Sequence, residues 1–304
     1  MNGFVVIDKP AGITSHDVVS RVRRILGTRR VGHTGTLDPF ATGVLPVAVN
    51  EGTKAIPFLD EGLKRYEAVL RLGVTTDTLD TTGRVLREAD FSSITGESLE
   101  ASLTRFTGVI SQIPPMYSAI KQGGQPLYRL ARQGREVERA PRQVEIRSLE
   151  MLSFAPPLVS MRVLCSRGTY VRTLADDIGT LLGCGAALQE LRRTASGPFV
   201  ISEAVTIDQL DGAAREGRAE ALCLAPWSAL AHLADIPLTD AGLAKVRQGR
   251  SPEWGDTNVA QPCACDAPML VRLSREKRLV AVAEIAPASA ADPRIVLKRV
   301  FICD

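Results

Sequence analysis

The sequence predicts an α+β fold with a small separate β domain at its C-terminal end, and three observations lead to this prediction. The chain has 304 residues, 45% of them hydrophobic and 23% charged, which is typical of a globular protein with one large or two ordinary domains. Segments with strand-like alternation of apolar residues are interspersed with segments of helical spacing. Beyond residue 235 a hairpin pattern and a final strand dominate. We therefore divide the chain into residues 1–235 and 236–304.

The N-terminal segment predicts a strand followed by a basic helix. Residues 3–8 form a short apolar run of the kind found in buried strands. Thr14 and Asp17 then have the spacing of a capping box, and Gly27 supplies a C-terminal stop. Arginines lie off the apolar stripe of this helix and continue beyond it: Arg21, Arg23, Arg24, Arg29 and Arg30.

Residues 32–46 predict a rigid irregular loop, on which the rest of the interpretation depends. The segment contains three glycines, two prolines, one histidine and one carboxylate, Asp38. We expect the prolines to interrupt regular structure and the glycines to let a ligand approach closely. Such a loop can present a reactive acid. The alternative is a tight turn in which Asp38 caps its own backbone.

The remaining elements follow from the same patterns. Strands are expected at 45–49, 65–72, 144–154, 159–165, 270–273, 279–283 and 294–301. Helices are expected at 53–59, after Gly96, across the Ala-rich stretch 208–235, and at 238–246. A further helix opens at Thr169 or Tyr170, with Val171, Leu174, Ile178 and Leu181 facing inward. Residues 75–83 form a polar loop that carries Asp77 and Asp80.

Residues 113–142 differ from the rest of the chain. Prolines and glycines interrupt the segment repeatedly, and basic residues alternate with Tyr117 and Tyr128. We interpret it as an insertion that becomes ordered on a polyanion. The alternative is a solvated excursion with a short helix near 127–132.

Composition and charge limit the classes of function. The net charge of +3 is small, but arginines cluster at 21–30 and at 129–147. Such clusters are suited to binding the phosphate backbone of a nucleic acid. The alternative is that these arginines only solvate exposed faces. The chain lacks phosphate-binding and dinucleotide-binding glycine motifs, and it has only three histidines. Cys263 and Cys265 lack a second pair, so we interpret them as ordinary thiols and expect no metal. No leader or membrane-length apolar run is evident, so we expect a cytoplasmic protein.

This elimination leaves Asp38 as the candidate reactive group. An isolated aspartate can act as a nucleophile or as a base. From the residues alone, the chain is a nucleic-acid-associated enzyme or a binding protein with a loop carboxylate.

Six blocks of sequence resemble the tRNA pseudouridine synthase B family. The first block is GHTGTLDPFATGVLPV together with DKPAGITS, which precedes it at residues 8–15. The other five are KRYEA, TDTLD, IPPMYSA, CSRGTYVRTL and LRRT, and all six lie in the same order as in the family within residues 1–200. The C-terminal segment resembles the small PUA-type RNA-binding domain of the family more loosely. Asn50 and Gly52 depart from the pattern, where a Gly and an Ala are expected.

The resemblance implies a fold, a reaction and a set of site residues. The fold is a mixed, largely antiparallel sheet flanked by helices, and the reaction is isomerisation of uridine 55 in the tRNA T loop to pseudouridine, without a cofactor. Asp38 is the implied nucleophile, attacking either the sugar C1′ or the base C6, and Arg172 is its ionic partner. Tyr66 stacks on the base and is one candidate for the acceptor of the C5 proton. The implied substrate-binding residues are Lys9, His33, Asp80, Tyr170 and Leu191.

Alternatives to these roles remain open at this point. Leu191 is equally a core leucine, and Lys9 a surface lysine before a turn. The leading expectation is a monomeric enzyme that binds the tRNA T stem-loop without guide RNA, as the insertion resembles the bacterial stand-alone type. A non-catalytic RNA-binding or tRNA-folding protein is the second hypothesis. A glycoside hydrolase using Asp38 is the third, although no second acid is evident.

Overall fold

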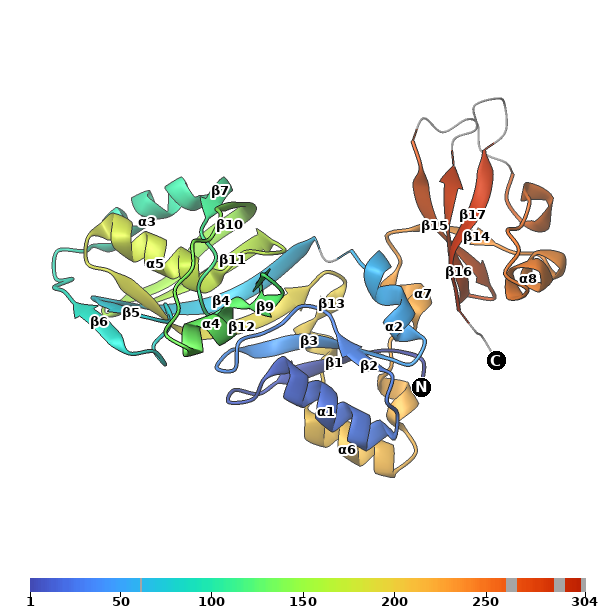
Figure 1. Cartoon of the computed structure of the whole chain (residues 1–304), viewed down its shortest axis with the longest axis horizontal. Coiled ribbons are helices and arrows are strands. Elements are labelled where there is room, and N and C mark those ends of the chain that lie inside the picture. Colours follow the sequence, from blue (N-terminus) through green and yellow to red (C-terminus); the bar gives the residue numbers. More distant parts are fainter. Residues whose placement is uncertain (61, 261–266, 287–292, 302–304) are drawn as a thin grey trace.

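A mixed nine-stranded sheet organises the N-terminal two thirds of the chain (Figure 1). The computed structural model describes residues 1–60, 62–260, 267–286 and 293–301. The main strand order is β1-β3-β12-β4-β11-β10-β7, with β2 beside β3 and β13 beside β12. Only β3 and β12 run parallel; the other pairs are antiparallel, which confirms the predicted fold class. The strands are β1 (Gly3–Lys9), β2 (Val31–His33), β3 (Thr42–Val49), β4 (Leu63–Leu72), β7 (Gly108–Gln112), β10 (Arg142–Ala155), β11 (Leu158–Ser166), β12 (Ala186–Ser196) and β13 (Phe199–Val200).

Helices lie beside both ends of this sheet. In Figure 1, α3 and α5 lie together near one end of the sheet, and α1 and α6 lie together near the other end. The segments expected to be helical at 53–59 and 208–235 form shorter pieces broken by 3₁₀ turns. The helices of this part are α1 (Ser15–Leu26), α2 (Gly52–Ala55), α3 (Gly96–Leu103), α4 (Leu127–Arg132), α5 (Val171–Leu182), α6 (Ile207–Arg215) and α7 (Pro226–Ala229).

Helix α1 has the boundaries that its sequence predicts. The Thr14 side chain accepts a hydrogen bond from the Asp17 amide, and the Asp17 carboxylate accepts one from the Thr14 amide. Gly27 ends the helix in the left-handed conformation. Because Val18 and Val22 are buried, the exposed face of α1 is left to its basic residues.

The helix that follows β11 begins as predicted but turns a different leucine toward the core at its end. Val171, Leu174 and Ile178 are buried, whereas Leu181 is 39% exposed, so its predicted inward orientation is wrong. The apolar stripe continues from Ile178 to Leu182, four residues on, which packs against the core.

The prediction that prolines interrupt structure throughout 32–46 is also wrong in part, because Pro46 lies inside β3. The Pro46 carbonyl accepts a hydrogen bond from the Thr34 amide, which lies on the side of β3 that faces β2. The N and C=O groups of one residue point to the same side of a strand, so the missing N–H of Pro46 removes no bond to β1. The irregular loop is therefore limited to residues 34–41.

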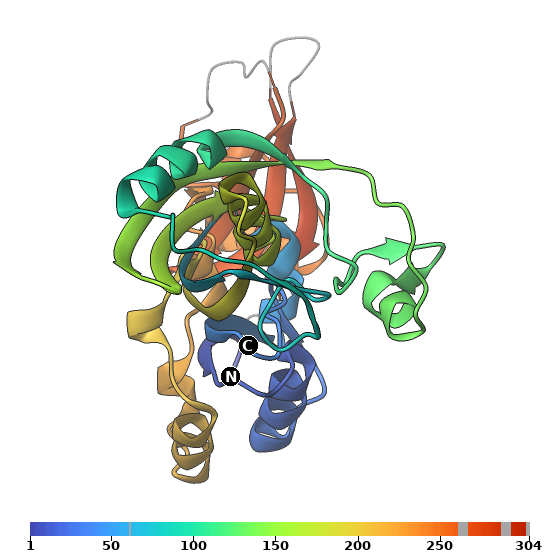
Figure 2. The same ribbon diagram turned by 90° about the vertical axis from the view of Figure 1, so that its left-hand side faces the viewer.

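The insertion between β7 and β10 stands out from the sheet (Figure 2). Two-residue strands β8 (Lys121–Gln122) and β9 (Gln125–Pro126) form a small hairpin that leads into α4. The short helix near 127–132 is thus present. Another small ribbon, of β5 (Val74–Thr76) and β6 (Val85–Glu88), flanks the polar loop of residues 77–84.

The predicted C-terminal β domain is confirmed as a four-stranded sheet in the order β14-β15-β16-β17. Its elements are β14 (Ala234–Pro237), α8 (Asp240–Arg247), β15 (Met269–Arg275), β16 (Arg278–Ala286) and β17 (Arg294–Val300). Strand β14 begins before the division expected at residue 235. Cys263 and Cys265 lie outside the described residues.

An apolar cluster joins the two sheets. Phe4 and Val44 of the large sheet share this cluster with Val282 of β16 and with Phe301, and all four are buried. The Lys54 ammonium also donates a hydrogen bond to the Val300 carbonyl, 3.3 Å away. In the described part of the chain, no helix is long and apolar enough to span a membrane.

Candidate active site

The Asp38 loop is held in place by contacts within the protein. The Ser15 hydroxyl accepts a hydrogen bond from the Leu37 amide at 2.9 Å, and Leu37 itself is buried. The backbone is held on both sides of Asp38, at Leu37 and at Pro39, and the Asp38 side chain is 32% exposed. The carboxylate is therefore accessible to a substrate, although the loop that carries it is not free to move.

Gly35 in the Asp38 loop and Gly43 near the start of β3 are required by the protein's own backbone conformation. Gly35 has φ +74°, and a Cβ there would lie 2.6 Å from the Lys64 ammonium. Gly43 has φ +101°, and a Cβ there would lie 2.2 Å from the Arg193 carbonyl. Gly43 therefore allows β3 to pack closely against β12, and both positions have a backbone conformation that favours glycine. The close approach of a ligand to the loop stays a prediction.

Lys9 is fully buried, so its interpretation as a surface lysine is wrong. Its ammonium donates hydrogen bonds to the carbonyls of Pro10, Ile13 and Pro39, at 2.9, 2.7 and 3.1 Å. Burial lowers the pKa of Lys9 to about 8, and the nearby Asp38 charge acts in the opposite direction. Since all three protons are used, Lys9 holds the residue after Asp38 rather than offering a donor to a substrate.

Arg172 contacts Asp38 at two points. Its Nε lies 2.9 Å from Oδ2, and its Nη2 donates a hydrogen bond to Oδ1 at 3.0 Å. The arginine side chain is only 4% exposed, in contrast to that of Asp38. Burial raises the pKa of the Asp38 carboxyl, while the Arg172 guanidinium opposes that shift and favours the carboxylate.

Arg172 is oriented by the polar loop that precedes β6. Its Nη1 donates to the Thr78 carbonyl at 3.0 Å and lies 3.7 Å from the Asp80 carboxylate. Asp80 is buried, and its other oxygen accepts hydrogen bonds from the Thr78 hydroxyl and the Thr82 amide. Leu79, between these Arg172 partners, has φ +63°, which is costly for a leucine.

The two predicted tyrosines lie on different elements around this pair. Tyr66 on β4 is 7% exposed, and burial raises the pKa of its phenol. Tyr170 precedes α5, and burial also raises its pKa. The Asp38 charge raises the pKa of Tyr170 further, and the Arg172 charge lowers it. Both phenols therefore stay protonated at neutral pH.

The structure brings Lys9, Tyr66, Asp80, Tyr170 and Arg172 into electrostatic or direct contact with Asp38. The other two predicted residues lie on strands of the large sheet. Leu191 pairs with Ala68 of β4 and is 8% exposed within the main core, and His33 ends β2 opposite Val47.

The sequence interpretation gave no role to Gln112 and Arg193. Arg193 is fully buried, and it donates hydrogen bonds to the carbonyls of Val44 and Gly35, which brace the Asp38 loop. Strand alternation was the missed signal, because Leu191 and Arg193 are buried while Arg192 pairs with Asp8. Gln112 bonds the backbone of Tyr170, and no sequence pattern indicates this contact.

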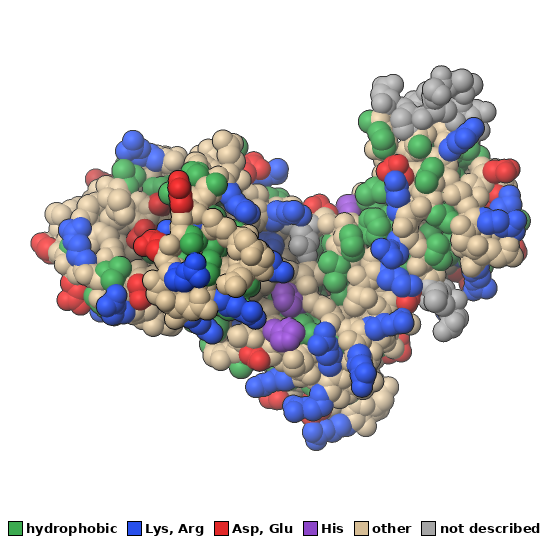
Figure 3. Space-filling model, in the orientation of Figure 1, with side chains coloured by type: hydrophobic (Ala, Val, Ile, Leu, Met, Phe, Trp, Pro, Cys, Tyr) green, Lys and Arg blue, Asp and Glu red, His purple; other side chains and the backbone are tan. Residues whose placement is uncertain are grey.

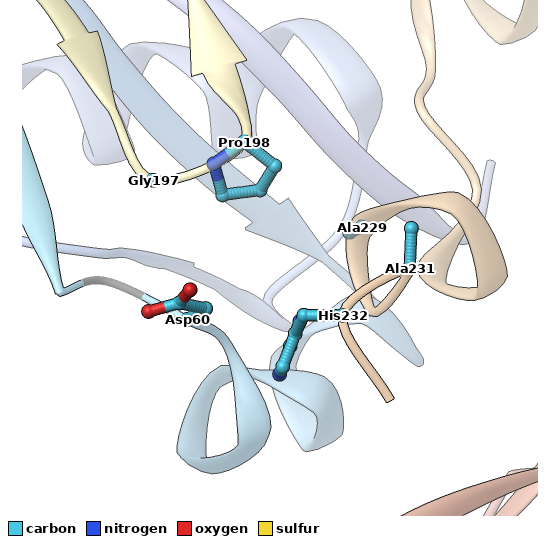
Figure 4. Close-up of a pocket in the computed structure, with 6 residues that line it drawn as sticks. All are labelled: Asp60, Gly197, Pro198, Ala229, Ala231 and His232. Carbon is cyan, nitrogen blue, oxygen red and sulfur yellow. The ribbon is translucent and has the colours of Figure 1, made fainter. Parts of the chain in front are cut away.

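A separate hollow of about 250 Å³ lies near the junction of the two sheets (Figure 4). Its lining consists of Asp60, Gly197, Pro198, Ala229, Ala231 and His232, none of which is a predicted site residue. Among the residues described by the structure, no group of three His, Cys, Asp or Glu side chains could hold a metal ion.

Comparison with known proteins adds a consistent set of similarities. Residues 23–171 match the N-terminal domain of TruB family pseudouridylate synthases, and residues 172–231 match a tRNA pseudouridylate synthase B C-terminal domain. The tRNA pseudouridine synthase B of Geotalea uraniireducens is 56% identical over 93% of this chain and 92% of its own length. That of Geobacter sulfurreducens is 50% identical over 99% of this chain and 100% of its own.

Solved structures are similar in fold along nearly the whole chain. A chain of an H/ACA ribonucleoprotein bound to a substrate RNA containing 2′-deoxyuridine has a TM-score of 0.74 and 25% identity, over 99% of this chain and 85% of its own. A chain of an archaeal box H/ACA Nop10–Cbf5 complex has a TM-score of 0.72 and 26% identity, over 99% of this chain and 86% of its own.

Proposed function

The chain belongs to the TruB family of pseudouridylate synthases, and on this basis we propose that Asp38 is the nucleophile with which it isomerises uridine 55 in the tRNA T loop. The enzyme class is that of its relatives: an isomerase that converts a uridine of tRNA to pseudouridine. The choice of uridine 55 and the role of each residue belong to the proposal.

The contact between Arg172 and Asp38 is the observation that carries the proposed mechanism. A nucleophile must be ionised and reachable, and Asp38 is 32% exposed beside a guanidinium that is almost fully buried. We propose that the carboxylate attacks C1′ or C6 of the extruded uridine. The bond between N1 and C1′ breaks and a bond between C5 and C1′ forms. The bond between the Asp38 oxygen and the nucleoside breaks again, C5 loses a proton and N1 gains one. The atoms balance without an oxidant or reductant, so we expect no cofactor.

Tyr66 and Tyr170 fit supporting roles beside the base. A buried, protonated phenol offers an apolar ring surface for stacking. Because burial raises the pKa of Tyr66, its oxygen is a poor base at neutral pH, and it accepts the C5 proton only if the geometry of the bound base strongly favours the transfer. We propose Tyr66 and Tyr170 as walls of the uridine pocket, with Leu191 beside them.

Extraction of the base from the T loop costs a few kcal/mol of stacking. We propose that His33, next to the Asp38 loop, occupies or borders the space that the uridine leaves. Asp80 contributes by orienting Arg172, and Lys9 by holding the loop.

The charge distribution supports RNA as the partner. Lys and Arg side chains gather over α1 and along the side of the C-terminal domain that faces the large sheet (Figure 3). The arginines of α1 and the following turn are exposed at positions 21, 24, 29 and 30. We propose that these residues and the insertion at 113–142 contact phosphates of the T stem-loop, and that the PUA-like domain contacts phosphates elsewhere on the tRNA. Action as a cytoplasmic monomer without guide RNA is part of the same proposal.

Release of label from C5 tests the reaction directly. Unmodified tRNA labelled with tritium at uridine C5 is incubated with the intact protein, with Asp38→Asn, and with Asp90→Asn. Asp90 is an exposed carboxylate in the turn after β6 and serves as the matched control. We expect release by the intact protein and by the control, and none by Asp38→Asn while tRNA binding persists. Equal release by all three would exclude Asp38 as the nucleophile, and no release by any would leave a binding protein as the explanation.

A further inference from the structure

Gln112 makes an unusual pair of contacts where the insertion leaves the sheet. It is the last residue of β7, and it is 2% exposed. Its Nε2 donates a hydrogen bond to the Tyr170 carbonyl at 3.3 Å, and its Oε1 accepts one from the Tyr170 amide at 3.1 Å. The side-chain amide of Gln112 thus pairs with both backbone groups of one residue, as a neighbouring strand would.

Tyr170 is the residue at which the chain turns into α5. It precedes the helix in an extended conformation, and its own side chain does not cap the helix. Arg172 follows two residues later, in the first turn. The direction in which α5 begins, and with it the direction of the Arg172 side chain, therefore depends on how the Tyr170 backbone is held.

A second contact joins the same two segments. Arg172 Nη2, the atom that bonds Asp38, also donates a hydrogen bond to the Tyr117 carbonyl at 2.8 Å. Tyr117 lies five residues after Gln112, at the start of the insertion. The segment from Gln112 to Tyr117 is consequently attached to the segment from Tyr170 to Arg172 at both ends.

We propose that Gln112 is a positioning residue of the isomerisation, which fixes Arg172 against Asp38 and joins the insertion to the catalytic pair. The inference rests on the proposed function of Asp38. It also has a consequence for substrate binding: an RNA that contacts the insertion acts on the segment that orients Arg172.

The protonation of Asp38 provides a readout that a purely structural role of Gln112 would not affect. Five groups act on this carboxyl or lie under its influence: Arg172 and Tyr170 at the start of α5, Asp80 in the polar loop, Lys9 on β1, and Tyr66 on β4. Arg172 and Lys9 favour the carboxylate, whereas burial and Asp80 oppose it. If Arg172 moves away from Asp38, it opposes burial and Asp80 less strongly, and the pKa of Asp38 rises further.

The test compares Gln112→Met with Gln143→Met in the full-length protein. Methionine keeps the volume of glutamine but forms neither hydrogen bond. Gln143 is exposed on β10, paired with Ser111, one residue from Gln112 along β7, and it is the matched control. Gln112→Glu is a second variant, which keeps the acceptor for the Tyr170 amide. For each, kcat is measured across pH with C5-labelled tRNA, together with tRNA affinity and Tm.

We expect Gln112→Met to lower kcat about tenfold to a hundredfold, since small misplacement of a catalytic group has effects of this size. The acid limb of its kcat profile should move to higher pH, with tRNA affinity within about twofold of the intact value. Gln112→Glu should retain more activity, and Gln143→Met should match the intact protein. An unchanged kcat and acid limb in both Gln112 variants would overturn the inference, as would loss of affinity alone. Inactivity of the intact protein would instead reject the proposed function.

Discussion

At the Asp38 carboxyl, burial and the charge of Arg172 act in opposite directions on one proton. The guanidinium lies against both oxygens of Asp38, and two more of its N–H groups donate hydrogen bonds to the carbonyls of Thr78 and Tyr117. A lysine could supply the charge but not this fork of donors. The two properties of arginine can therefore be separated by substitution.

Arg172→Lys and Arg172→Gln should differ in their pH dependence. We expect both to lower kcat at neutral pH by about a hundredfold or more, because the fixed geometry is lost in each. In Arg172→Gln the pKa of Asp38 should rise, since burial and Asp80 are no longer opposed by the adjacent cation. The kcat of Arg172→Gln should then still increase with pH over a range in which the kcat of Arg172→Lys is already constant. Identical pH profiles of kcat for the two variants would show that Arg172 does not act through ionisation of Asp38.

At the scale of single elements, α5 presents a carboxyl that the reaction does not use. Asp177 is half-buried, and burial, with a smaller contribution from Asp176, raises its pKa to about 6. A carboxyl with a raised pKa binds its proton more tightly in the folded state than in the unfolded state. Stability must therefore decrease as the pH rises from about 4 to about 6, through the two pKa values.

Asp177→Asn should remove this decrease in stability. The asparagine does not titrate, so the free energy of unfolding of the variant should exceed that of the intact chain above pH 6, by about 1 kcal/mol after allowance for solvent screening of a half-exposed group. Below pH 4 the advantage should disappear, because Asp177 is then protonated in both states. Urea unfolding at several pH values measures the difference. Asp90→Asn, whose carboxyl has a lowered pKa, should leave the decrease in place.

The elements also explain which parts of the fold could be predicted from the sequence. Thr14 and Asp17 fix the start of α1 because capping depends on neighbours in sequence, and β11 alternates because only one of its faces is buried. The location of Pro46 within β3 depends on β2, so no local pattern indicates it. Strand alternation indicates that Arg193 is buried, but its hydrogen bond to Val44 depends on β3. Similarly, Asp38 could be identified from its loop and family resemblance, whereas Gln112 is recognisable only once β7 and α5 are placed side by side.

At the scale of the whole molecule, the C-terminal sheet is attached to the rest by more than its linker. The Arg272 guanidinium lies 4.3 Å from the centre of the Trp227 ring and donates a hydrogen bond to the Trp227 carbonyl. Its Nε lies 3.4 Å from Asp235, which also accepts a hydrogen bond from the Trp227 indole. Since Arg272 belongs to β15 and Trp227 to α7, the cluster fixes the C-terminal sheet against the segment that precedes it.

Arg272→Met should weaken recognition of whole tRNA while sparing the chemistry. Methionine keeps apolar contact with Trp227 but loses the cation–π interaction, the ion pair with Asp235 and the hydrogen bond to the Trp227 carbonyl, worth about 1–3 kcal/mol together. If the C-terminal domain contacts tRNA beyond the T stem-loop, its looser attachment should raise KM for full-length tRNA by about tenfold or more. The kcat and KM for an isolated T stem-loop should remain unchanged, because Arg272 lies far from Asp38 in sequence and its contacts are with Trp227 and Asp235. An equal rise of KM for both substrates would mean that the domain acts on the catalytic site itself, and no rise for either would remove it from tRNA recognition.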